Sequence, residues 1–145
     1  MSLDLPRIFR IAGLHTALAC SGAAALIYES TWGRMLHRVF GVSDLAIATV
    51  LSTFFLGLGI GSAVGGWLAT RVRRRAWTYA ALEGCVGLIA VLSLVLVPRF
   101  HSVYTSLGAG ASFPSLTAIR LALALAVLLP PTVMMGATLP VLIAL

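Results

Sequence analysis

The sequence predicts an all-α, polytopic membrane protein with four transmembrane helices, and three observations lead to this fold class. First, long apolar stretches recur, and residues 45–70 run for 26 residues without a charged side chain. A hydrocarbon core about 30 Å thick is crossed by about 20 apolar residues at 1.5 Å each. Second, hydrophobic residues make up 60% of the chain and charged residues only 10%, whereas a soluble domain has about 25% charged residues. Third, the stretches are continuous runs and do not alternate with period two, as the strands of a membrane barrel do.

The four spans account for nearly the whole sequence, at about residues 11–33, 45–70, 76–97 and 117–145. We expect them to form a single transmembrane domain over residues 1–145, with an irregular glycine-containing segment at 99–115. Pro130 and Pro131 remove two adjacent amide donors, so the fourth helix is expected to kink or break there. The fourth span is still apolar at the last residue, which predicts that the chain is part of a longer protein.

The distribution of arginine predicts the topology. The chain has ten basic residues, all arginine, and a net charge of +6. Basic residues concentrate in the cytoplasmic loops of membrane proteins. Six of the ten lie on one side, before the first span and between spans two and three: Arg7, Arg10, Arg71, Arg73, Arg74 and Arg75. We therefore expect both termini in the cytoplasm (N-in/C-in) of a multi-pass inner-membrane protein, and no nucleic-acid partner.

Small residues repeat at helical spacing in the second span. Gly57, Gly61 and Gly65 are spaced by four, which places them on one helix face. Such a face lets two helix backbones approach closely in lipid. The first span carries a similar ridge, which ends in Glu29 and Gly33. The structural interpretation is tight helix packing, and the functional alternative is a sliding or rocking surface of the kind that transporters use.

Glu29 is an acid within the first span, between Tyr28 and Trp32. A carboxylate in hydrocarbon is costly, so it is normally paired, neutral or directed into a polar cavity. One interpretation is an ion pair with Arg34 or Arg38, or snorkelling to the interface. The other is a cation or proton site with Tyr28 and Trp32 as neighbouring candidate ligand-binding residues. Trp32 is also expected to anchor the span at the membrane interface.

Glu83 is the second acid within a span and the fourth candidate ligand-binding residue. It lies one to two turns into the third span, where an ion pair with an arginine of the 71–75 loop is the favoured interpretation. The three histidines lack metal-ligand spacing, so no metal is predicted. The glycines of the second span lie in a lipid-length helix and cannot form a phosphate-binding loop. No cofactor and no catalytic residue are predicted within this chain.

Four segments together carry a family resemblance: SGAAALIYESTWGRML at 21–36, FFLGLGIGSAVGGWLATRVRRR at 54–75, YAALEGCVGL at 79–88 and LPPTVMMGATLPVL at 129–142. In this order they resemble the membrane module of the fused major-facilitator/spermidine-synthase-like proteins. The resemblance implies a soluble aminopropyltransferase domain downstream, which would be a transferase and is absent from these residues. Residues 66–75 also resemble the major-facilitator loop between helices two and three, although Thr70 stands where that pattern has Asp.

The resemblance and the residues together predict a membrane anchor or scaffold that binds a small cationic ligand, such as a polyamine, near Glu29. One alternative is part of a major-facilitator-like transporter, in which Glu29 and the fourth span line a translocation path. Another is a small assembly subunit that forms homo-oligomers through its glycine faces. The expected partners are the lipid bilayer and further transmembrane helices, supplied by a second copy or by the missing C-terminal part of the same protein.

Overall fold

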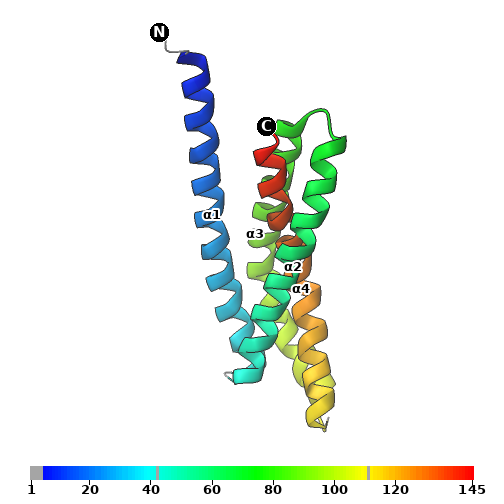
Figure 1. The fold of residues 1–145 in the computed structure, drawn as a ribbon. Helices are drawn as coiled ribbons and strands as arrows, with labels where there is room; N and C mark the ends of the chain where they lie inside the picture. Colours follow the sequence, from blue (N-terminus) through cyan, green and yellow to red (C-terminus); the bar gives the residue numbers. More distant parts are fainter. Residues whose placement is uncertain (1–4, 42, 111) are drawn as a thin grey trace.

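The computed structural model describes residues 5–41, 43–110 and 112–145. Four helices fill these ranges: α1 (Leu5–Phe40), α2 (Asp44–Arg71), α3 (Arg75–Gly108) and α4 (Phe113–Ile143). They run alternately up and down (Figure 1). Each is long and apolar enough to cross a membrane, and the described residues contain no strand. This confirms the predicted all-α, four-span fold class and makes the chain a membrane protein whose outer helix faces contact lipid.

The connections between the helices are short. Gly41 adopts a φ of +80°, and the hydroxyl of Ser43 then caps α2 by accepting a hydrogen bond from the Ala46 amide at 3.2 Å. Three residues, 72–74, join α2 to α3. The beginning of α1, the end of α4 and this basic loop all lie at the same end of the molecule (Figure 1). We call this the basic-loop end; that it faces the cytoplasm stays a prediction.

The expected irregular segment at 99–115 is wrong over most of its length. The helix α3 continues through Pro98 as far as Gly108, and the chain turns only at Gly110, where φ is +76°. The hydroxyls of Ser102 and Thr105 donate to carbonyls one turn earlier, so these polar residues are satisfied within the helix. The predicted third span, 76–97, has only the length needed to cross the hydrocarbon, whereas the helix continues beyond it.

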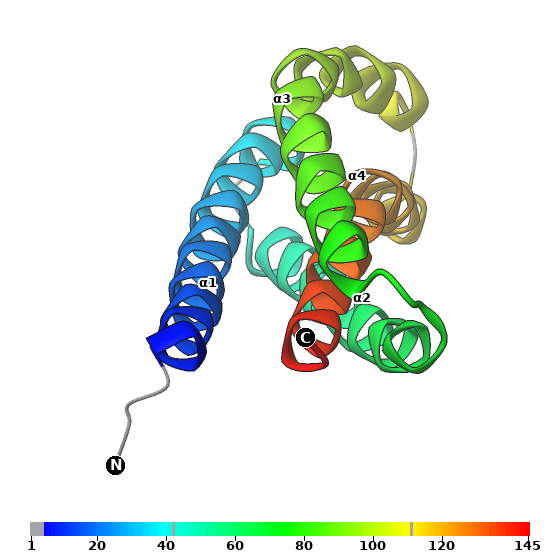
Figure 2. The same ribbon diagram turned by 90° about the horizontal axis from the view of Figure 1, so that it is seen from above.

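The tightest contact in the bundle joins α2 to α4, which lie side by side in both views (Figures 1 and 2). Gly57, Gly61 and Gly65 are all buried on this seam. A Cβ atom added to Gly65 would come within 2.6 Å of the Cα and carbonyl oxygen of Ala137. The missing side chains therefore allow backbone to meet backbone, which is how small residues join helices in lipid.

The prolines of α4 bend the helix without breaking it. Helical structure runs through Pro130, Pro131 and Pro140, and the first and second halves of α4 point in different directions (Figure 2). Pro140 has no amide to donate to the Gly136 carbonyl, four residues earlier. The hydroxyl of Ser62 on α2 donates to that carbonyl at 3.3 Å instead. A neighbouring helix thus satisfies the acceptor that the proline frees.

The helix α1 is peripheral. Its beginning stands away from the other helices, and its C-terminal part joins them (Figure 1). Trp32 and Leu36 are buried, whereas Leu26 and Ile27 are 66% and 63% exposed. The glycines of its small-residue ridge have open space around them, with no atom within 4 Å of a built Cβ. The ridge on α1 therefore does not make the close helix contact that the seam on α2 makes.

Candidate functional site

Hydrogen bonds of polar side chains connect α1 to α3 at successive positions along the two helices. Three hydrogen bonds make the connection: Tyr79 Oη to the Ala17 carbonyl at 3.5 Å, Ser21 Oγ to Glu83 Oε1 at 2.5 Å, and Trp32 Nε1 to Ser93 Oγ at 2.8 Å. The partners are separated by 62, 62 and 61 residues. A constant offset means that the two helices run parallel, with Glu83 in the middle of their contact.

A cavity of about 160 Å³ lies beside Glu83 and is lined by all four helices. Ser21 and Tyr28 come from α1, Leu58 from α2 and Thr138 from α4. Among the described residues, Glu83 is the sole charged side chain in this lining. We call this space the Glu83 cavity. It brings together two of the predicted candidates, Glu83 and Tyr28, and adds Ser21, which was not among the predicted candidates.

The expected ion pair between Glu83 and the 71–75 loop is not formed. Within the described ranges, no cationic side chain lies within 4 Å of the Glu83 carboxylate, whose hydrogen-bond partner is the hydroxyl of Ser21. Arg75 instead donates to the carbonyls of Ala69 at 3.1 Å and Ala144 at 2.6 Å. This arginine thereby ties the loop to the end of α4. For Arg75, backbone carbonyls take the place of the expected carboxylate partner.

Depth in the membrane makes Glu83 unusual. It lies eight residues after Arg75, where α3 begins, and this corresponds to about 12 Å along the helix. The side chain is half-buried in the protein. An ionised carboxylate at this depth loses most of its hydration, and such a group is stable only if it is paired, protonated or in contact with a polar cavity.

Glu29 lies in a different environment. It is half-buried and lines a cavity of about 430 Å³, mainly between α1 and α2, together with Arg34 and His37. No ion pair with Arg34 or Arg38 occurs in the described part of the chain. Arg34 and Arg38 follow Glu29 by five and nine residues, so neither has the spacing of three or four residues at which side chains on a helix meet. The predicted local ion pair is therefore disfavoured by helix geometry.

Trp32 is not the interfacial anchor that its position near the span end suggested. It is 2% exposed, stacks on Tyr28 with ring centroids 5.4 Å apart, and donates its indole N–H to buried Ser93. The other two tryptophans, Trp67 and Trp77, are 55% and 74% exposed near the basic-loop end. Their exposure suits interfacial aromatics, whereas Trp32 is a core residue.

The basic loop presents a solvated surface. Arg73 and Arg74 are exposed, and the guanidinium of Arg71 lies 4.4 Å above the ring of Trp67, a cation–π contact at the membrane edge. No cluster of three metal-ligand side chains occurs among the residues that the structure describes.

No protein-family model matches the chain, and no curated protein or solved structure matches it either. The resemblance to spermidine-synthase-like proteins therefore stays a prediction.

Proposed function

We propose that this chain is an integral-membrane module that anchors and scaffolds a larger assembly and binds a small organic cation at Glu83. One observation carries the proposal. A carboxylate that lies about 12 Å along α3 borders a cavity formed by all four helices, and no cationic side chain in the described structure pairs with it. A cation entering the cavity would supply the missing charge.

The comparison with Glu29 supports this choice of residue. The sequence favoured Glu29 as the cation site, but its cavity also contains Arg34 and His37. A positively charged side chain lowers the affinity of the same cavity for a cation. The Glu83 cavity has no such residue in its described lining, so we move the proposed site from Glu29 to Glu83.

The size and lining of the Glu83 cavity indicate the class of ligand. Pockets for drug-sized ligands have volumes of about 300–1,000 Å³, and this cavity has about 160 Å³. It fits a single ammonium group with a few methylene groups, such as one end of a linear polyamine. The ring of Tyr28 lines the same cavity, and an aromatic face attracts a cation. Apolar residues provide the rest of the lining and suit the methylene groups.

The anchoring role draws on the fold and on the family resemblance. In a spermidine-synthase-like protein, a four-helix module of this kind would hold a soluble transferase domain at the inner membrane. The common end for the start of α1, the end of α4 and the basic loop is consistent with cytoplasmic termini. A ligand site in the module would then lie about 12 Å from the face that such a domain occupies.

Thermal unfolding of the purified chain in detergent tests the site, with spermidine as the probe. A ligand that binds only the folded state stabilises it by about 2.7 kcal/mol at a concentration of 100 Kd. We expect spermidine to raise the unfolding temperature of the parent chain and of the Glu29→Gln control. The Glu83→Gln variant should fold but show no such increase. An equal increase in the Glu83→Gln variant would show that spermidine binds elsewhere.

A transporter is the second candidate function, and the position of α1 favours it. The N-terminal part of α1 stands apart from the bundle at the basic-loop end, while the Glu83 cavity lies between α1 and the other helices. Movement of α1 would open that cavity toward one membrane face. Uptake of radiolabelled spermidine by liposomes containing the chain separates the two functions: a binding module accumulates no label inside the vesicles, whereas a transporter does.

A further inference from the structure

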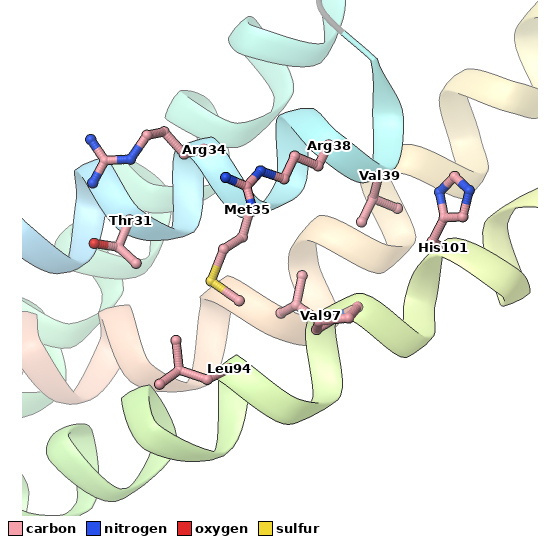
Figure 3. A pocket seen from close by; sticks show the side chains of 9 residues that line it. Thr31, Arg34, Met35, Arg38, Val39, Leu94, Val97 and His101 are labelled. Atoms are coloured by element: carbon pink, nitrogen blue, oxygen red, sulfur yellow. The ribbon is translucent and has the colours of Figure 1, made fainter.

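A third and larger pocket lies between α1 and α3, at the end opposite the basic loop. It has a volume of about 640 Å³. Figure 3 shows Met35 projecting from α1 into the gap, with Leu94 and Val97 facing it from α3. Arg34 and Arg38 extend along α1 above the gap, and His101 lies at its far end on α3. The pocket therefore has an apolar floor and a basic rim.

The charged side chains that line this pocket in the described structure are all basic. Arg34 and Arg38 are exposed, and neither forms an ion pair or a hydrogen bond within the described ranges. His101 adds an imidazole, and no acidic side chain occurs in the described lining. Guanidinium groups recognise phosphate and carboxylate through paired N–H donors. The rim is thus complementary to an anion, and the floor is complementary to hydrocarbon.

The pocket lies at the level of the lipid headgroups when helical residues are counted across the membrane. A hydrocarbon core about 30 Å thick takes about 20 helical residues. Counted from Ile11, where the apolar part of α1 begins, 20 residues end at Ser30, one turn before Arg34. Counted from Ala76, just after α3 begins, 20 residues of α3 end at Val95. Both counts place the basic rim at the membrane interface and the apolar floor at the edge of the hydrocarbon.

We propose that this pocket binds an anionic phospholipid, with the phosphate on Arg34 and Arg38 and the upper part of an acyl chain on the apolar floor. Its volume lies in the range of about 300–1,000 Å³ that is usual for specific ligand sites. A phospholipid is the one common anion that presents phosphate and hydrocarbon together at this depth. The bound lipid would join α1, the peripheral helix, to α3.

The test measures thermal unfolding of the purified chain in micelles doped with phosphatidylglycerol or phosphatidylcholine. The Arg34→Gln/Arg38→Gln variant removes the rim. The Arg73→Gln/Arg99→Gln variant removes the same charge from exposed positions that do not line the pocket. We expect phosphatidylglycerol to stabilise the parent and the control more than phosphatidylcholine does. The rim variant should bind phosphatidylglycerol about 25-fold more weakly, because each arginine near an anionic lipid contributes about fivefold.

Three outcomes would overturn the proposal. Equal weakening in both double variants would mean that lipid responds to overall charge and not to this pocket. Equal stabilisation of the parent by the two lipids would remove the requirement for an anion. Stabilisation by soluble glycerol phosphate at matched concentration would show that a free anion suffices and that the apolar floor is irrelevant. Circular dichroism in the micelles doped with phosphatidylcholine verifies that the rim variant is folded.

Discussion

Replacing Gly65 by alanine tests whether the seam between α2 and α4 holds the bundle together. The new Cβ would lie 2.6 Å from the Cα and carbonyl oxygen of Ala137. Carbon atoms normally approach to about 3.5–4.0 Å, so the two backbones must separate by about 1 Å. Backbone cannot rotate away as a flexible side chain can. The change is therefore small in volume but has to move a whole helix.

The cost follows from the lost contacts. A gap of about 0.5–1 Å forfeits a quarter to a half of the attraction between atom pairs, each worth about 0.1–0.2 kcal/mol. If the seam has about as many pairs as one buried leucine, about 40–60, the loss is about 1–6 kcal/mol. Overpacked cores typically lose about 1–3 kcal/mol, and we expect the Gly65→Ala variant to fall in that range.

Gly59 on the same helix is the matched control. A Cβ there meets no atom within 4 Å, and alanine is the better helix former by about 1 kcal/mol. The Gly59→Ala variant should thus be neutral or slightly stabilised. Unfolding in mixed micelles with increasing dodecyl sulfate, followed by tryptophan fluorescence, gives both free energies of unfolding. If the two variants have the same stability, the seam is not the close contact described and the reasoning fails.

Three further outcomes are expected. Trp32→Phe should lower the free energy of unfolding by more than the hydrogen bond alone contributes, because it also removes part of a buried ring; the loss should be about 1 kcal/mol smaller in a Ser93→Ala background, where the hydrogen bond is already absent, and equal losses in both would mean that the indole N–H contributes nothing. Ser62→Ala should cost about 1 kcal/mol but almost nothing when Pro140→Ala restores the helical amide, and a double-mutant cycle measures the difference. A cysteine at Arg73, in a variant without the native cysteines, should resist membrane-impermeant maleimide in intact cells, whereas rapid labelling would reverse the proposed topology.

The fold class was predictable because the bilayer imposes a length that hydropathy can detect. Residues 45–70 nearly coincide with α2, which begins at Asp44 and ends at Arg71. The end of α3 was not predictable in the same way, because the helix leaves the hydrocarbon before it stops at Gly108. The pairing of α2 with α4 was also out of reach. A glycine ladder shows that a close contact is permitted but does not identify the helix that makes it.

The candidate site was predictable only in part. A carboxylate within a span is a strong signal, and it marked both Glu29 and Glu83. Their partners could not be read from the sequence, since Ser21 reaches Glu83 across 62 positions. The ridge on α1 resembled the seam on α2 in sequence, yet α1 has open space around its glycines. Small residues remove a barrier to contact, and the attraction has to come from other side chains.

The pairing of helices in this bundle has a consequence for its biogenesis. Of these four helices, α1 and α2 are synthesised before α3 and α4, but the close-contact partner of α2 is α4. The hydrogen bonds of α1 reach α3, made after α2. After insertion, α1 and α2 must therefore remain in the bilayer with these contact faces against lipid until α3 and α4 have been made. We expect the chain to reach its native packing only after the fourth helix has been inserted, which makes the interval before that event the time at which insertion factors or proteases have the best access to it.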